Sequence, residues 1–209
     1  VQPKTVMREL RMIRVLIDWA KDERRADMKD NPARHLRVRG TGDSRAPFFT
    51  YEDEKRLLYE LSQMSNQNHL RLTKLALTTG FRRSELLSLS WKNLDLEKNK
   101  IYVQRKECAA RGNASSMRIV PLPSKAKKLL RSFENKEGKV IPLTKGSARN
   151  GFDKARKSAG LENLRFHDLR HIAISRMWSY RMNALEISTC SGHRDIKMLM
   201  RYSHYQLSF

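Results

Sequence analysis

Apolar residues recur at helical spacing over most of the chain. Residues 5–29 follow this period and predict an amphipathic helix with a basic outer face. Residues 37–47 are rich in Gly, Pro and short polar side chains, so we expect a linker there and a domain boundary near residue 45. Thr50 and Asp53 have the spacing of a capping box for a helix that runs to residue 64. A further helix over residues 69–79 is expected to end at Gly80.

The period changes to that of β-strands between residues 93 and 122. Residues 101–106 and 117–122 form two short runs with strand character, and residues 109–116, with Gly112 and Asn113, predict the loop of a hairpin. From residue 147 onward the pattern is helical again. In the last of these helices, Ile196, Leu199 and Met200 are expected to face the core. The pattern predicts a fold that is mainly α with a small antiparallel β-sheet.

The charge of the chain favours a polyanionic partner. The 43 Lys and Arg residues outnumber the 22 Asp and Glu residues, which gives a net charge of +21. DNA, RNA and an anionic membrane surface all fit this charge. No apolar stretch approaches the ~20 residues of a membrane span and no signal peptide is visible, so we expect a cytoplasmic protein. The only two cysteines, Cys108 and Cys190, form no CxxC motif, which argues against a disulfide framework or a thiolate metal site.

Two arginines have the properties needed to hold a phosphate. A guanidinium donates two parallel hydrogen bonds and keeps its charge, and fixed cations stabilise the charge that a phosphodiester gains under attack. Arg82 follows the expected helix end at Gly80, and Glu85 stands three residues later, where it could orient Arg82. His167 and Arg170 have the i, i+3 spacing of one helix face. Arg82 and Arg170 are also each compatible with an ordinary surface position.

A histidine and a tyrosine near the end of the chain complete this set. His193 follows Gly192 at the entry to the last predicted helix, and Tyr202 stands near the end of that helix. A tyrosine can act as a covalent nucleophile when its phenol is held in line with the phosphate. Tyr205 is the nearby competitor for this role, and a core or surface aromatic is the simpler interpretation of either residue.

A metal site is the alternative use of these histidines. His167 and His171 have i, i+4 spacing, and His193 or His204 could complete a site. The chain lacks the glutamate of an HExxH motif and an acidic cluster of the kind that holds Mg²⁺. The sequence therefore predicts chemistry without a metal or another cofactor.

Four motifs together resemble those of the tyrosine recombinases, or phage-type integrases. They are the TGFRRSELLSLSW run at residues 79–91, HDLRH at 167–171, SGH at 191–193 and RYSH at 201–204. The resemblance covers residues 45–209, and the tail over residues 164–204 is most similar to integrases of phages, mobile elements and shufflon systems. Their order and spacing are far more specific than any single motif.

The resemblance implies a role for each matching residue. Arg82 and Arg170 would clamp the scissile phosphate, His193 would donate to its oxygens, and His167 would assist proton movement. Tyr202 would attack to form a 3′-phosphotyrosine linkage and release a 5′-hydroxyl.

A lysine on the hairpin of the family's sheet acts as general acid, and Lys106 matches its place. Lys106 and Arg118 stand twelve positions apart, farther than in many integrases, which implies a longer hairpin loop. Arg105 and Arg111 are the fallbacks for this role.

The resemblance also implies partners and domains. Double-stranded DNA would be bound by a homotetramer on two sites, with accessory DNA-bending proteins, no membrane and no cofactor. The basic residues expected to contact DNA are Arg105, Arg111, Arg118, Lys154, Arg156 and Lys157. Residues 1–44 would be the C-terminal part of a helical core-DNA-binding domain plus linker, and residues 45–209 a catalytic domain with a truncated C-terminus.

Three other functions stay open from the sequence. A DNA-binding module could keep the fold without catalysis, and a type IB topoisomerase would share the same chemistry. An RNA-binding protein is disfavoured because the aromatic sheet motifs of common RNA binders are missing. The preferred interpretation is a site-specific recombinase that acts on DNA in the cytoplasm, associated with the nucleoid, of bacterial or phage origin.

Overall fold

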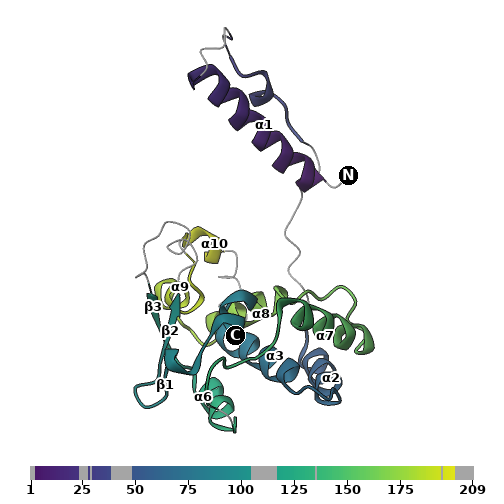
Figure 1. The fold of residues 1–209 in the computed structure, drawn as a ribbon, viewed down its shortest axis with the longest axis vertical. Coiled ribbons are helices and arrows are strands. Elements are labelled where there is room, and N and C mark those ends of the chain that lie inside the picture. The colour runs from purple at the N-terminus through teal and green to yellow at the C-terminus, as the bar shows by residue number, and fades with distance from the viewer. Residues whose placement is uncertain are drawn as a thin grey trace. The chain divides into compact units, whose positions relative to one another are not determined.

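The computed structural model describes residues 3–23, 28, 30–38, 49–104, 117–134, 136–193 and 195–200. The chain divides into two compact units, Val1–Ala46 and Pro47–Phe209. The division falls in the stretch whose composition predicts a linker. The two units are described separately (Figure 1).

The first unit consists of helix α1 (Pro3–Glu23) and a segment that folds back along it through the 3-10 turn η1 (Pro32–Arg34). The Asn31 amide donates to the backbone oxygen of Arg14 at 2.9 Å and to Asp18 at 2.8 Å. The Asn31 side-chain oxygen accepts from Ala33 N at 3.0 Å, so this one residue caps η1 and ties it to the helix.

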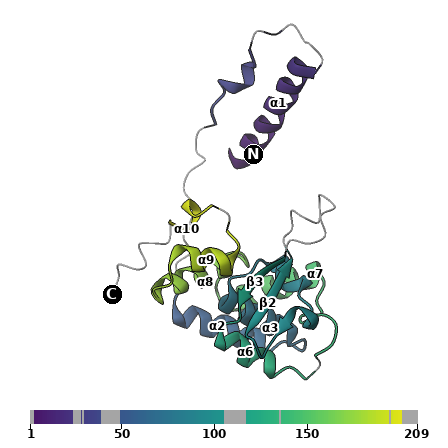
Figure 2. The same ribbon diagram turned by 90° about the vertical axis from the view of Figure 1, so that its left-hand side faces the viewer.

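The second unit combines helices with one small sheet (Figure 2). Its three strands pair antiparallel in the order β1-β2-β3, which confirms the predicted fold class. In chain order its elements are α2 (Tyr51–Ser62), α3 (Asn68–Thr79), α4 (Arg83–Ser88), η2 (Trp91–Asn93), β1 (Leu94–Asp95), β2 (Lys100–Gln104), β3 (Met117–Pro121), α6 (Ser124–Arg131), α7 (Lys145–Ser158), α8 (Asp168–Ser179), α9 (Ala184–Ser191) and α10 (Lys197–Met200).

Helix α3 is the centre of the second unit. Helices α2, α4, α6, α7 and α8 all contact it, and Leu72, Leu75 and Ala76 on it are each 1% exposed. The buried residues of α3 also include the polar His69, Thr73 and Thr79, so the helix is enclosed on more than one side. Because its C-terminal end is fixed by this packing, the turn that follows α3 has a defined position.

The sheet presents alternate residues of its strands to the core. Ile101 pairs with Val120 between β2 and β3, and both are 1% exposed. Period-2 alternation then places Val103 and, opposite it, Arg118 on the same buried face. Ile119, between Arg118 and Val120, is 50% exposed. A charged residue thus occupies a core-facing position next to the site described below.

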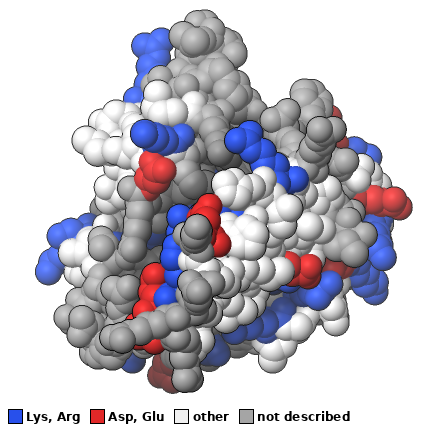
Figure 3. All heavy atoms as spheres, turned by 90° about the horizontal axis from the view of Figure 1, so that it is seen from above, with Lys and Arg blue, Asp and Glu red and all other residues white. Residues whose placement is uncertain are grey.

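The positive charge is spread over the described surface. On the face shown in Figure 3, Lys and Arg side chains are interspersed with Asp and Glu side chains. None of the helices that the structure describes combines the length and the apolar character needed to cross a bilayer.

Candidate active site

Arg82 is placed by the turn at the end of α3. Gly80 caps α3 in the left-handed conformation, with φ of +66°, and the chain reverses so that Arg82 becomes the N-cap residue of α4. The Arg82 backbone N–H donates to Glu85 Oε2 at 2.9 Å, and Arg82 Nη1 donates to Glu85 Oε1 at 3.2 Å. One carboxylate therefore fixes both the backbone and the guanidinium of Arg82.

Arg170 lies in the first turn of α8 and is almost entirely inside the protein, at 3% exposed. Its Nη1 donates to the carbonyl oxygen of Gly80 at 2.7 Å. Because Gly80 begins the turn that positions Arg82, this bond connects the two arginines that the sequence assigns to the phosphate.

His193 follows Gly192, which caps α9 with φ of +70°. Arg170 Nη2 lies 3.3 Å from His193 Nδ1 and 3.2 Å from its Nε2, and Ser191 Oγ lies 2.7 Å from Nδ1. Burial, followed by the charges of Arg170 and Arg82, lowers the pKa of His193 to about 4. The imidazole is therefore neutral at physiological pH.

His167 is the N-cap residue of α8, one turn before Arg170. Its ring meets that of His171 edge to face, with centroids 5.0 Å apart. Desolvation, and then the neighbouring charges of His171 and Arg170, lower the pKa of His167, and desolvation likewise lowers that of His171. Within the described part of the chain, no group of three or more His, Cys, Asp or Glu side chains is arranged to hold a metal ion.

The side chains of Arg82, His167, Arg170 and His193 line one cavity of about 850 Å³. They come from the N-terminus of α4, from α8 and from the end of α9, which are far apart in the sequence. The strands contribute Gln104 and Arg118 to the same cavity. Lys106 and Tyr202, with Arg105 and Arg111, lie outside the residues that the structure describes.

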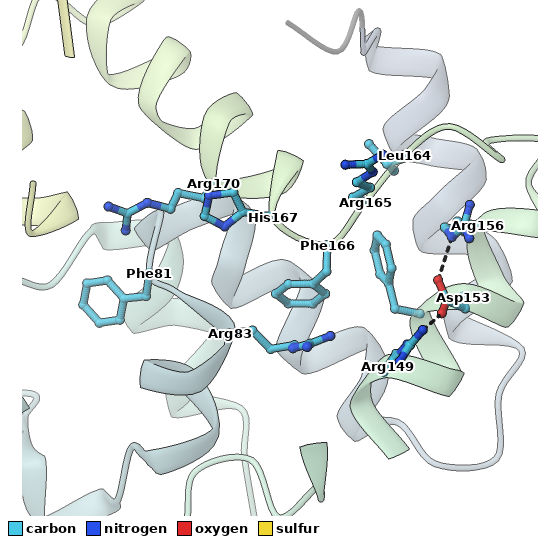
Figure 4. A pocket seen from close by; sticks show the side chains of 11 residues that line it. Phe81, Arg83, Arg149, Asp153, Arg156, Leu164, Arg165, Phe166, His167 and Arg170 are labelled. Carbon is cyan, nitrogen blue, oxygen red and sulfur yellow. Dashed lines mark hydrogen bonds and ion pairs between the residues drawn. The ribbon is translucent and has the colours of Figure 1, made fainter. Parts of the chain in front are cut away.

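His167 and Arg170 also line a second cavity of about 440 Å³. Figure 4 shows Arg83 beside Phe166 in its lining, with Asp153 bonded to Arg149 and Arg156 farther along. Arg170 lines both cavities, and its Nη2 lies against His193, which lines the first cavity.

The basic residues that are predicted to contact DNA differ in how exposed they are. Lys154 and Lys157 are exposed on α7, and Arg156 Nε donates to Asp153 at 2.8 Å. Arg118, interpreted from the sequence as a DNA contact, is 8% exposed and its side chain faces the protein interior. The cause is strand alternation, which puts Arg118 on the same face as Val120. That alternation is visible in the sequence and could have indicated the burial.

Ser191 belongs to the SGH motif, but no role was predicted for it from the sequence. It is 0% exposed, and its hydroxyl contacts the His193 ring. The signals for a role are its place in that motif and its position two residues before His193. A small polar residue before glycine is also typical of an ordinary helix end.

The sequence profile of the phage integrase family matches residues 47–208. The chain belongs to the phage integrase family. The resemblance drawn from the four motifs is thereby confirmed.

Individual relatives agree with this assignment. The chain is 33% identical over 205 residues to the shufflon-specific DNA recombinase of Escherichia coli, and the match covers 96% of this chain and 50% of that protein. The catalytic domain of bacteriophage HP1 integrase superposes with a TM-score of 0.61 at 26% identity, covering 76% of this chain and 87% of that one.

A Tn1549 transposon integrase in complex with transposon right end DNA shares the fold, with a TM-score of 0.72 at 18% identity over 97% of this chain and 75% of that one. The chain spans about half the length of the curated relatives that it matches, 50% of the shufflon recombinase and 57% of the integrase of Escherichia phage 186.

Proposed function

We propose that this chain is the catalytic part of a site-specific DNA recombinase that cleaves and rejoins strands through a 3′-phosphotyrosine intermediate. The observation that carries the proposal is the convergence of Arg82, Arg170, His167 and His193 on one cavity. Two guanidiniums and two neutral imidazoles match a pentacoordinate phosphate, which gains negative charge on its nonbridging oxygens. The family membership supports the same chemistry.

In this proposal Tyr202 supplies the nucleophile. Its phenol oxygen forms a bond to phosphorus while the bond from phosphorus to the 5′-oxygen breaks, and His167 assists removal of the phenol proton. Lys106 gives a proton to the departing 5′-oxygen. In the second half of the reaction, a 5′-hydroxyl of the partner strand attacks the phosphotyrosine and releases Tyr202. The linkage conserves the phosphodiester bond energy, so neither ATP nor a metal is required.

The neutral state of His193 suits a hydrogen-bond donor next to two arginines. Arg170 Nη2 lies about equally far from both ring nitrogens and favours neither tautomer. Ser191 Oγ lies 2.7 Å from Nδ1, and by donating to that nitrogen it would leave the ring proton on Nε2. An Nε2–H can then donate to a nonbridging phosphate oxygen. The guanidinium of Arg170, held at Gly80, needs little reorganisation when the phosphate enters.

The substrate in this proposal is double-stranded DNA. The net charge of +21 and the exposed Lys154 and Lys157 of α7 support contacts to phosphates. The Tn1549 relative is in complex with transposon DNA. Assembly of a tetramer on two DNA sites, with accessory bending proteins, belongs to the same proposal, as does a bacterial or phage setting.

We further propose that the first unit belongs to a helical DNA-binding domain. Ile13, Leu16 and Trp19 on α1 are 48%, 61% and 50% exposed within that unit. Apolar side chains in a continuous helical surface are usually covered by further protein. The basic residues between them suit contact with DNA on the remaining face.

The test is strand cleavage in EDTA with fragmented DNA from the organism and element that encode the chain. Complexes that survive SDS are captured and their DNA ends sequenced. We expect protein attached to 3′ ends, with free 5′-hydroxyls, at a defined sequence. Tight, salt-dependent binding with no covalent product would favour the noncatalytic DNA-binding module instead, and nicking with relaxation but no defined site would favour a type IB topoisomerase.

A further inference from the structure

Arg118 places a charge at a core-facing position of β3. Its neighbours on that face of the sheet, Val120 in the same strand and Val103 opposite, are apolar and buried. Transfer of a guanidinium from water to such a position is unfavourable unless an opposite charge and hydrogen-bond acceptors meet it. The groups that offset the buried charge of Arg118 therefore indicate the role of this residue.

The compensating charge is Glu85. Arg118 Nη2 donates to Glu85 Oε2 at 3.2 Å, and each of the two side chains is only 9% exposed. The same carboxylate accepts from the backbone N–H and from the Nη1 of Arg82. Glu85 thus lies between two guanidiniums, and its position depends on Arg118 as well as on Arg82.

The other side of the Arg118 guanidinium lies against the backbone that leads into His193. A Cβ atom at Gly192 would fall 1.9 Å from Arg118 Nη1 and 2.7 Å from its Cζ, so only glycine leaves room there. The guanidinium also lies over the ring of Phe81, 5.2 Å from its centroid. Arg118 therefore touches Gly192 and Phe81, the residues immediately before His193 and Arg82.

We propose that Arg118 is a positioning residue that sets the separation of Arg82 and His193 across the cavity. A single guanidinium joins β3, the N-terminus of α4 and the end of α9. The effect on catalysis rests on the proposed function, whereas the positioning is a property of the free protein. β3 directly follows residues 105–116, which include Lys106. Through the contacts of Arg118 with Glu85 and Gly192, a displacement of β3 would also move Arg82 and His193.

The positioning role and a DNA contact make opposite predictions for Arg118. A residue that contacts a phosphate contributes to DNA affinity and to its salt dependence. A residue that holds two catalytic groups in place contributes to the rate at saturating DNA and leaves affinity nearly unchanged. The burial of Arg118 and its bond to Glu85 favour the second behaviour.

The first experiment uses the free protein and needs no DNA. The ring signals of selectively ¹⁵N-labelled histidines are recorded for the wild-type chain, Arg118→Met and Arg118→Lys. Arg176→Met is the matched control, because it removes an arginine–glutamate ion pair, with Glu54, between α8 and α2. His69, buried beside Gly151, reports the integrity of the core.

We expect the His193 signals to shift in both Arg118 variants and to stay in place in Arg176→Met, while the His69 signals stay unchanged in all three. Lysine keeps the charge but cannot contact Glu85 and Gly192 with one planar group, so its variant also shifts His193. Unchanged His193 signals in a folded variant would overturn the proposal. If Arg118→Met fails to fold, the lysine variant alone decides in the same way.

The second experiment measures single-turnover cleavage of the DNA that the wild-type protein captures. At saturating DNA we expect Arg118→Met to lower the rate by about 100-fold, the size of effect that a displacement of about 1 Å can cause. Glu85→Gln should lower the rate by a smaller factor in the Arg118→Met background than in the wild-type chain, because the contact that the two residues share is already lost and only the bonds from Arg82 to Glu85 remain to be weakened. A normal rate at saturation combined with a salt slope reduced by about one would instead mark a phosphate contact and overturn the proposal.

The two proposals fail in distinguishable ways. If the wild-type chain forms no covalent product with any captured DNA, the proposed function fails, and the histidine signals still decide whether Arg118 positions His193. If cleavage occurs but Arg118→Met leaves both the His193 signals and the rate unchanged, only the positioning role fails.

Discussion

The guanidinium of Arg170 donates a hydrogen bond of 2.7 Å to the carbonyl oxygen of Gly80, a residue 90 positions earlier in the chain. This bond connects the first turn of α8 to the turn that places Arg82. The same guanidinium lies against His193 through its other terminal nitrogen. The candidate phosphate-binding residues are therefore one connected structure, and each connection can be tested separately.

Arg170→Lys should lower the rate of strand cleavage by about 100- to 1,000-fold, the size of effect expected when one preorganised donor is lost. The lysine ammonium donates from one nitrogen only. It cannot reach Gly80, His193 and a phosphate at the same time, as the planar guanidinium with its separate nitrogens can. The measurement is single-turnover cleavage at saturating DNA. Arg131→Lys, an exposed position on α6, is the control, and equal rates for the two variants would contradict this role of Arg170.

Gly80→Ala should reduce the free energy of unfolding by about 1–2 kcal/mol, because φ of +66° is unfavourable for a residue with a Cβ atom. The new methyl group itself has room, since its nearest neighbours, in Ala173 and Met177, are 3.5 Å away. Gly146→Ala within α7 is the matched control and should be neutral or stabilising by up to about 1 kcal/mol. The measurement is urea unfolding, and equal effects of both variants would contradict the explanation from φ.

Stability should fall as the pH is lowered from 7.5 to 5. The pKa of His193 is about 4 in the folded protein, below its ordinary value of 6.5, and those of His167 and His171 are also lowered. The unfolded chain therefore binds more protons in this range, and stability that is present above pH 6.5 is lost toward pH 4. For His193 alone the loss down to pH 5 is about 2 kcal/mol.

Urea unfolding of the wild-type chain and of His193→Asn at several pH values measures this effect. The variant should show a shallower dependence on pH between 5 and 7, above the range in which carboxylates titrate. Identical slopes for the two proteins would show that His193 is not held neutral by its surroundings.

Ser191→Ala should slow cleavage by about tenfold, which corresponds to about 1.4 kcal/mol of transition-state stabilisation. The hydroxyl lies 2.7 Å from His193 Nδ1, and without it the proton is no longer confined to Nε2. Nitrogen chemical shifts of the His193 ring should show the mixed tautomers. Ser179→Ala, whose hydroxyl bonds only the backbone of its own helix, should alter neither measurement.

The sequence predicts those parts of the fold that depend on local signals. The capping box of Thr50 and Asp53 is present at the start of α2, and α3 ends at Gly80 as expected. The two strands pair with Ile101 opposite Val120. These features depend on spacing and on backbone conformation within a few residues, which a single sequence contains.

The features that depend on tertiary contacts were missed. Ile196 and Met200 were expected in the core, but they are 39% and 52% exposed, and only Leu199 of that group is buried. Arg118 is expected from the sequence to contact DNA, but it is 8% exposed and forms an ion pair with Glu85, 33 residues away in the chain. Strand alternation can indicate that Arg118 is buried, but no local pattern identifies Glu85 as its partner.

The most direct test of the central claim is to identify the residue that becomes linked to DNA. The wild-type chain, Tyr202→Phe and Tyr205→Phe are incubated in EDTA with the captured DNA site, digested with nuclease and protease, and the peptides are examined by mass spectrometry. We predict a nucleotide on the Tyr202 peptide of the wild-type chain and of Tyr205→Phe, and no adduct in Tyr202→Phe. An adduct that persists in Tyr202→Phe, or cleavage without any tyrosine adduct, would contradict the proposed mechanism.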